Sequence, residues 1–226
     1  MNVIAGLAAA GLAASSLSLA PGLEHQEAFG QPNTFQAPPA HHNKMYIIGD
    51  SIACGVLSTG GLEKVLRDEG WDLQIHRAVG RPLVGSSAAK SCDLDAHKEY
   101  PGIYETRLSD DEKAIKQADV ILTILGTNDY AEAPQVQKEA AKSYIEHLDE
   151  LNPKARKLWA DTFLKGHGLG YDQMNKAIKA SGVDEMIRWG SIAPPYYTDS
   201  PDGIHPAARG YKALANLIHQ SVKKPS

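Results

Sequence analysis

Residues 119–125 read Asp-Val-Ile-Leu-Thr-Ile-Leu, and Gly126-Thr127-Asn128-Asp129 follow directly. After the leading aspartate every side chain is apolar or threonine, without the polar alternation of a half-exposed strand. Such a run is expected for a central strand that is covered on both faces, as in parallel sheets. The sequence therefore predicts a buried strand here, ending at a glycine and a group of polar side chains.

Strand-like and helix-like segments alternate on either side of this run. Shorter apolar segments predict four further strands, over residues 45–48, 73–79, 156–163 and 183–189. Apolar residues at helical spacing lie around residues 62–66, 109–118, 134–151, 171–178 and 206–218. This alternation predicts an α/β fold with a five-stranded parallel sheet and helices on both faces.

Ligands of open parallel sheets bind beyond the carboxyl ends of the strands, so the residues that follow each strand matter most. Ser51 follows the first predicted strand, and Gly80 follows the second. Asn128 lies after the third strand, and Asp202 and His205 lie in the loop beyond the fifth. We expect these residues to meet along one edge of the sheet.

Together, these five residues supply what acyl transfer requires. A serine hydroxyl becomes a nucleophile when a base takes its proton, and histidine suits that role because its pKa lies near neutrality. Asp202 could orient the imidazole of His205, three residues away, so that both form a triad with Ser51. The backbone N–H groups of Ser51 and Gly80 and the amide of Asn128 could donate to the oxyanion.

Each of these residues also has a structural interpretation. Ser51 could cap a helix, Asn128 could form an Asx-turn, and Asp202 could form a turn before a glycine. Two further aspartates are expected to be structural rather than catalytic. Asp50 would orient the serine loop, and Asp129 would accept backbone N–H groups.

Four blocks of sequence carry a resemblance to a known family. They are Gly49-Asp50-Ser51, Gly80, Gly126-Thr127-Asn128-Asp129 and Asp202-Gly203-Ile204-His205-Pro206. In this order, they resemble the signature blocks of the SGNH (GDSL) hydrolases. The resemblance implies a three-layer α/β/α, flavodoxin-like sandwich and a serine esterase that works through an acyl-enzyme. It implies Ser51, Asp202 and His205 as the triad, Ser51, Gly80 and Asn128 as oxyanion donors, and neither a metal nor an organic cofactor.

The second block reads Ala78-Val79-Gly80-Arg81-Pro82, where many family members have asparagine or serine before the glycine. This form is similar to SGNH domains that handle acetyl groups on polysaccharide or peptidoglycan, including O-acetyltransferases. The resemblance thus implies a short-chain or acetyl ester, on a small molecule or a glycan, with hydrolysis and transfer as alternatives. Arg81, Tyr196 and Tyr197 are candidates for substrate contact, with solvation of Arg81 and packing of the tyrosines as the alternatives.

The first 43 residues contain no lysine or arginine, unlike the rest of the chain. Residues 1–20 are mainly Ala, Gly, Leu and Ser, which indicates a signal peptide or an anchor, and residues 21–43 resemble a linker. Residues 44–226 would then be the SGNH domain. One interpretation is a secreted or cell-envelope protein. The alternative is a retained segment that attaches the domain to a membrane, a virion or another assembly, where it could be a structural module.

The formal net charge is −4, with both signs mixed along the chain, and this does not predict a nucleic-acid partner. Neither Cys54 nor Cys92 lies in a metal-binding spacing. In a reducing compartment both would be free thiols, the interpretation that we favour. In an oxidising one they could form a bridge between the serine helix and residues 81–108, a stretch without a clear pattern of elements.

Overall fold

The computed structural model describes residues 43–87, 90–92, 100–101 and 108–223. The apolar segment predicted over residues 1–20 and the linker predicted after it, up to His42, lie outside the described residues. Within the part of the chain that is described, no helix is both long and apolar enough to cross a membrane. The described residues belong almost entirely to the domain predicted to begin at Lys44.

A parallel sheet forms the centre of the described domain. Its strands are β1 (Lys44–Gly49), β2 (Asp72–Val79), β6 (Val120–Ile124), β7 (Arg156–Ala160) and β8 (Glu185–Ile187). Their spatial order is β2-β1-β6-β7-β8, and every neighbouring pair is parallel. The five predicted strands are confirmed, although β7 and β8 are shorter than predicted. A two-residue strand, β4 (Lys90–Ser91), pairs antiparallel with the end of β2.

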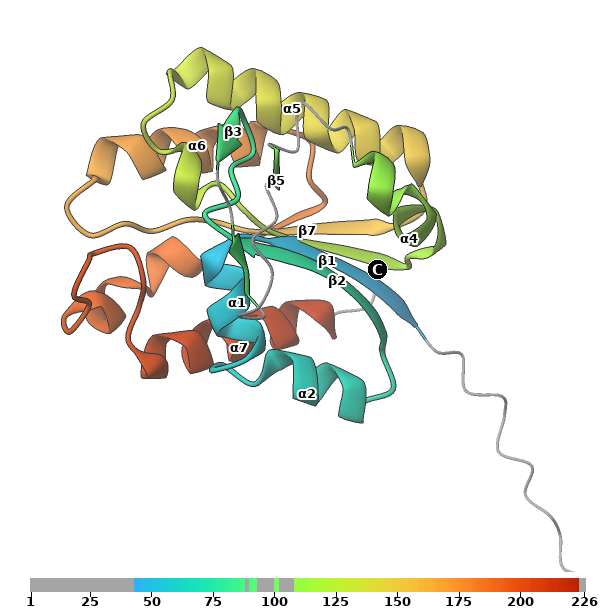
Figure 1. The fold of residues 1–226 in the computed structure, drawn as a ribbon, viewed down its shortest axis with the longest axis horizontal. Helices are drawn as coiled ribbons and strands as arrows, with labels where there is room; N and C mark the ends of the chain where they lie inside the picture. The colour runs from blue at the N-terminus through green and yellow to red at the C-terminus, as the bar shows by residue number, and fades with distance from the viewer. Residues whose placement is uncertain (1–42, 88–89, 93–99, 102–107, 224–226) are drawn as a thin grey trace, which may run out of the picture. The chain divides into compact units, whose positions relative to one another are not determined.

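Helices cover both faces of this sheet (Figure 1). One face carries α1 (Ser51–Leu57), α2 (Leu62–Asp68) and α7 (Ala208–Val222), and the other carries α4 (Glu112–Gln117), α5 (Pro134–Leu151) and α6 (Gly168–Ala180). The connections contain the 3-10 turns η1 (Ser109–Asp111), η2 (Thr127–Asp129), η3 (Trp189–Ser191) and η4 (Pro194–Tyr197). This is the three-layer α/β/α arrangement that the resemblance implies.

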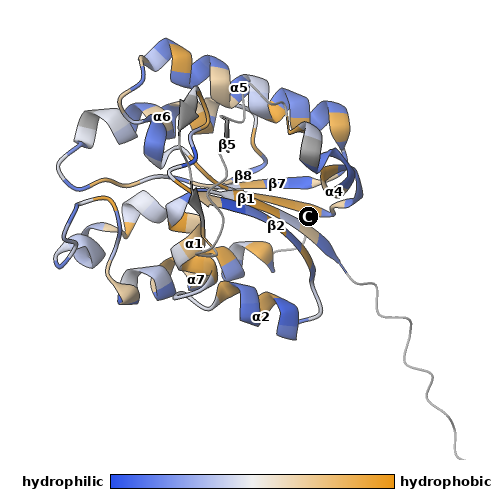
Figure 2. Ribbon diagram, viewed as in Figure 1, coloured by the Kyte–Doolittle hydropathy of each residue, from blue (hydrophilic) through white to orange (hydrophobic). Residues whose placement is uncertain are grey.

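Two apolar cores lie on the two faces of the sheet because side chains alternate along each strand. In β1, Met45 and Ile47 belong to the core beneath α1, α2 and α7, whereas Tyr46 and Ile48 belong to the other core. All five residues of β6 are buried, as the unbroken apolar run predicts. Figure 2 shows the hydrophobic residues concentrated in the sheet and on the helix faces that cover it. Since each large apolar side chain contributes about 1.5–3 kcal/mol when buried, the central strands stabilise the fold strongly.

The segment between β2 and α4 departs from the regular alternation. Its described parts are β4 and an antiparallel pair of two-residue strands, β3 (Ser86–Ser87) and β5 (Tyr100–Pro101). Cys92, next to β4, forms a disulfide with Cys54 in α1, and their Cα atoms are 5.8 Å apart. The interpretation of the cysteines as free thiols is therefore wrong. The bridge ties this segment to the helix that begins at Ser51.

Candidate active site

The chain turns sharply from β1 into α1, and this turn presents Ser51. Gly49 permits the close approach of strand and helix, because a Cβ atom at this position would overlap the side chain of Ala53. Asp50 is the N-cap of α1, and its Oδ1 accepts the N–H of Ile52 at 2.8 Å. Since Asp50 caps the helix, the interpretation of Ser51 as the helix cap is wrong, and its hydroxyl is available for other contacts.

Ser51, His205 and Asp202 form a continuous hydrogen-bonded chain. Nε2 of His205 lies 2.8 Å from Oγ of Ser51, and Nδ1 of His205 lies 2.7 Å from Oδ2 of Asp202. With its proton on Nδ1, a neutral imidazole donates to Asp202 and leaves Nε2 to accept the hydroxyl proton of Ser51. The fold thus brings together two residues, Ser51 and His205, that lie 154 positions apart in the chain.

The imidazole and carboxylate of this triad are open to solvent. The side chains of His205 and Asp202 are 37% and 43% exposed, whereas Ser51 is 9% exposed. Desolvation tends to raise the pKa of Asp202, but hydrogen bonds from His205 and from the N–H of Ile204 outweigh it and hold that pKa well below its usual range. Asp202 is therefore ionised at neutral pH and can stabilise an imidazolium.

The loop that carries Asp202 and His205 is held by contacts outside the triad. Ser200 Oγ donates to Oδ1 of Asp202 at 3.2 Å and accepts the N–H of Gly203 at 2.9 Å. The N–H of Lys165, beyond the end of β7, donates to the carbonyl oxygen of Gly203 at 2.7 Å. Neither Ser200 nor Lys165 is predicted from the sequence. Ser200 is close to the D-x-x-H block, but no local pattern marks Lys165.

Asn128 lies in η2, beyond the end of β6, and its amide reaches the ends of two other strands. Nδ2 donates to the carbonyl oxygen of Arg81 at 3.0 Å and to Oδ2 of Asp50 at 3.3 Å. The N–H of Ser51, the first residue of α1, has no acceptor within the helix. Gly80 turns the chain after β2 with a φ of 77°, which favours glycine. The predicted oxyanion donors thus gather where β2, β1 and β6 end side by side.

Two fully buried aspartates brace these loops, as expected for structural residues. Asp129 accepts the N–H groups of Leu83 and Val84, each at 2.9 Å, and so holds the chain beyond Gly80. Asp50 caps α1 and meets the amide of Asn128. Burial raises the pKa of Asp50 to about 7, and the neighbouring charge of Asp129 acts in the same direction.

The three residues predicted to contact substrate lie in different surroundings. Arg81 is only 3% exposed, so its side chain is neither solvated nor presented at the surface. Tyr197 is 1% exposed, and its ring packs on that of Phe163 with centroids 4.8 Å apart. Tyr196 is partly exposed and stacks on Trp189. Packing therefore accounts for Tyr197, and Tyr196 is the only one of these three residues that is not buried.

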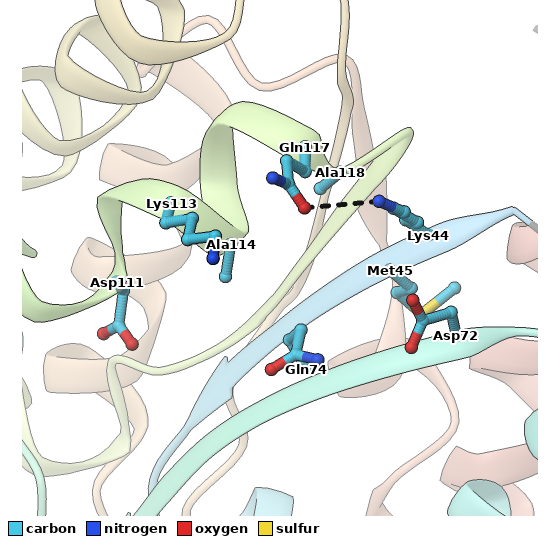
Figure 3. Close-up of a pocket in the computed structure, with 9 residues that line it drawn as sticks. All are labelled: Lys44, Met45, Asp72, Gln74, Asp111, Lys113, Ala114, Gln117 and Ala118. Carbon is cyan, nitrogen blue, oxygen red and sulfur yellow. Dashed lines mark hydrogen bonds between the residues drawn. The ribbon is translucent and has the colours of Figure 1, made fainter.

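A separate hollow of about 370 Å³ lies between α4 and the strands β1 and β2 (Figure 3). Its lining residues are Lys44, Met45, Asp72, Gln74, Asp111, Lys113, Ala114, Gln117 and Ala118. Nζ of Lys44 donates to Oε1 of Gln117 at 3.2 Å. Lys44 and Asp72 begin their strands, whereas Ser51 follows the carboxyl end of β1. The hollow is therefore distinct from the triad.

Comparison by sequence identifies no relative, since no protein family and no curated protein matches the chain. Solved structures do match. A protein from Parabacteroides merdae described as a GDSL-like lipase is 12% identical, with 80% of this chain and 95% of that chain covered and a TM-score of 0.52. A protein from Slackia heliotrinireducens described as an SGNH hydrolase is 15% identical. The match covers 80% of this chain and 98% of that chain, and the TM-score is 0.55.

A family 3 carbohydrate esterase from Clostridium thermocellum is also similar. It is 19% identical, the match covers 79% of this chain and 94% of that chain, and the TM-score is 0.52. At these identities the similarity concerns architecture. The chain therefore has the fold of the SGNH/GDSL hydrolases, and the fold that the sequence resemblance implies is confirmed.

Proposed function

We propose that this protein is a serine esterase that hydrolyses short-chain acyl esters, acetyl esters above all, with Ser51 as its nucleophile. The observation that carries the proposal is the hydrogen-bonded chain from Ser51 through His205 to Asp202. The chain lies at the carboxyl end of a parallel sheet, where such folds bind their ligands. Because one fold hosts many activities, the arrangement of these side chains supports the proposal more strongly than the fold does.

The reaction follows from the geometry. His205 Nε2 takes the proton of Ser51 as Oγ attacks the acyl carbon, and Asp202 stabilises the imidazolium. The oxyanion receives hydrogen bonds from Asn128 and from the backbone N–H groups of Ser51 and Gly80. His205 then returns the proton to the departing alcohol, and an acyl-enzyme remains on Ser51. Water, activated by His205, releases the acid. None of these steps calls for a metal or an organic cofactor.

The proposed substrate class is an acetyl or other short-chain ester on a small molecule or a glycan. Similarity in fold to a carbohydrate esterase from Clostridium thermocellum supports this class. Support also comes from the exposure of His205 and Asp202, because an ester on a large glycan must reach the triad from solvent. We expect deacetylation of O-acetylated xylan fragments to be measurable alongside cleavage of small esters.

Transfer of the acyl group to a sugar hydroxyl is the alternative outcome of the same acyl-enzyme. The Val79-Gly80-Arg81 sequence favours it, since this form is similar to that of SGNH domains that include O-acetyltransferases. Nε2 of His205, which activates water in hydrolysis, would activate a sugar hydroxyl in the same way, and the 37% exposure of this side chain leaves it accessible to either acceptor. Mass spectrometry of glycan oligomers incubated with p-nitrophenyl acetate would separate new acetyl esters from free acetate.

We also propose that the domain works in an oxidising compartment, secreted or in the cell envelope. The disulfide between Cys54 and Cys92 supports this, because such bridges are rare in reducing compartments. A retained N-terminal segment that joins the domain to a membrane or a particle is the alternative. N-terminal sequencing of the native protein would decide, since a cleaved signal peptide removes the first residues and an anchor keeps them.

The central test is hydrolysis of p-nitrophenyl acetate and of its longer-chain homologues. We expect Ser51→Ala to lower kcat/KM by about 10³-fold or more, because no other group supplies the nucleophile. Ser58→Ala is the matched control: Ser58 follows the same helix, is exposed and donates only to the carbonyl oxygen of Cys54. Equal rates for wild type and Ser51→Ala, or failure of a fluorophosphonate probe to label Ser51, would favour a structural or assembly module instead.

A further inference from the structure

The carboxylate of Asp50 contacts the nucleophile helix, the side chain of Thr127 and the amide of Asn128, the predicted oxyanion donor. Oδ1 accepts the N–H of Ile52 at 2.8 Å, and Oδ2 accepts Nδ2 of Asn128 at 3.3 Å. Asp50 immediately precedes Ser51 and is 0% exposed. A single buried carboxylate therefore joins the loop that carries the nucleophile to the side chain that would donate a hydrogen bond to the oxyanion.

The second contact of Asn128 completes its orientation. Its Nδ2 also donates to the carbonyl oxygen of Arg81 at 3.0 Å. Rotation about the terminal torsion of an asparagine is soft, so one acceptor does not fix the amide plane. Two acceptors, on the loops after β1 and β2, fix the plane of the Asn128 amide. They also determine that its nitrogen, and not its oxygen, faces Asp50 and Arg81. The longer contact, to Asp50, is the one that an incoming oxyanion could share.

We propose that Asp50 is a positioning residue, which fixes the amide plane of Asn128 so that the N–H donated to Asp50 can be shared with the oxyanion, and thereby increases kcat. This inference rests on the proposed esterase function of the same site. Asp50 itself touches neither the substrate nor the reacting atoms. Its effect on the reaction passes through Asn128.

The chemistry of a carboxylate explains why an amide would not serve at this position. An asparagine at position 50 has one acceptor, which the N–H of Ile52 requires, and its NH₂ group would then face the NH₂ group of Asn128. Two donors face to face would turn the amide of Asn128 away. An ionised carboxylate is costly at this buried position, because burial disfavours its charge and raises the pKa of Asp50 to about 7. The fold nevertheless places a carboxylate here.

Capping of α1 is the competing explanation, and two variants separate it from positioning. Asp50→Ser keeps a good helix cap but is too short to reach Asn128. Asp50→Asn keeps the shape but presents a donor. We expect both variants to lower kcat for p-nitrophenyl acetate by about 10- to 100-fold, with KM changed less than about 2-fold. Wild-type kcat in Asp50→Ser would overturn the proposal.

A double-mutant cycle with Asn128→Ala tests the coupling directly. Removal of one oxyanion donor is expected to lower kcat by about 10²- to 10³-fold. If Asp50 acts through this amide, adding Asp50→Asn to Asn128→Ala lowers kcat by less than about 2-fold more. A loss equal to that seen in the wild-type background would assign Asp50 to helix capping alone and overturn the proposal. Ser51→Ala reports separately on the esterase function itself.

A second measurement needs no Asp50 variant, in case these fail to fold. The ratio of kcat for wild type to kcat for Asn128→Ala cancels the titration of His205, which both proteins share. The charged and titratable groups near Asp50 are Asp129, and Tyr197 and Tyr211, whose pKa values burial raises. The ratio is expected to increase as pH rises through about 7, when Asp50 becomes a full acceptor. A ratio independent of pH would overturn the proposal.

Discussion

Asp202 holds His205 at two points. Its Oδ2 lies 2.7 Å from Nδ1 of the ring, and its Oδ1 accepts the backbone N–H of the same residue at 2.9 Å. The three-residue spacing permits this, because the turn through Gly203 brings the carboxylate back over the histidine that follows. The imidazole is thus fixed in position and in tautomer by one side chain.

Replacing this carboxylate with an amide is therefore expected to affect the reaction more than the fold. In Asp202→Asn the amide nitrogen can donate to Nδ1, which moves the ring proton to Nε2 and blocks the base. We expect kcat/KM for p-nitrophenyl acetate to fall by roughly 10²- to 10⁴-fold. Ser200→Ala, which loses a 3.2 Å contact to Asp202, is expected to cost less than about 10-fold. An active Asp202→Asn variant would contradict this role.

The pH dependence of stability should report on Asp50. Its folded-state pKa of about 7 lies above the value of about 3.9 expected in an unfolded chain. Between these values the folded state binds more protons, so the stabilising effect of protonated Asp50 is present at low pH and is lost as pH rises through about 7.

The matching measurement compares the Tm values of Asp50→Asn and wild type. The variant has no proton to lose, so we expect its Tm relative to wild type to increase from about pH 5 to about pH 8. Asp202 titrates below this window because its pKa is lowered, and both proteins share it. A Tm difference that stays constant over the window would contradict the raised pKa of Asp50.

The disulfide should contribute measurably to stability. Cys54 and Cys92 are 38 positions apart, and closing a loop of that size restricts the unfolded chain by roughly 3–4 kcal/mol. We expect the double variant Cys54→Ser/Cys92→Ser to lose stability of that order in urea unfolding. A reductant should lower the wild-type Tm and leave the double variant unchanged. Two alkylatable thiols in the native, unreduced protein would contradict the bridge.

Gly49 offers a test of the turn that presents the nucleophile. A methyl group at this position would overlap Ala53, so Gly49→Ala is expected to cost about 2 kcal/mol or more and to displace Ser51. Gly168→Ala is the matched control, because a Cβ there meets nothing within 4 Å. Its Tm should change little or rise slightly. Similar Tm values for the two variants would show that strand and helix can separate without cost.

Much of the fold follows from local patterns in the sequence. The unbroken apolar run of residues 119–125 marks a strand buried on both faces, and β6 is buried throughout. The alternation of strand-like and helix-like segments specifies a parallel sheet, because parallel strands need crossover connections. The positions of Ser51, Asn128 and His205 directly after strands then indicate one edge of that sheet.

The segment from Arg81 to Leu108 could not be predicted in the same way. Its described strands have two residues each, too short for any periodicity to register. Formation of the disulfide could not be predicted for the same reason, since the sequence does not reveal that Cys92 approaches α1. Burial of Arg81 is likewise a tertiary result, because the same side chain at a loop position is ordinarily solvated.

The sequence alone therefore determined the class of fold and the residue types available for acyl chemistry, because both depend on local pattern and on position after a strand. Only the tertiary structure decided which atoms meet. The order β2-β1-β6 brings three loops together, so that Asn128 reaches Asp50 and Arg81. Distances between groups remote in the chain depend on strand order and packing, and no local pattern encodes them.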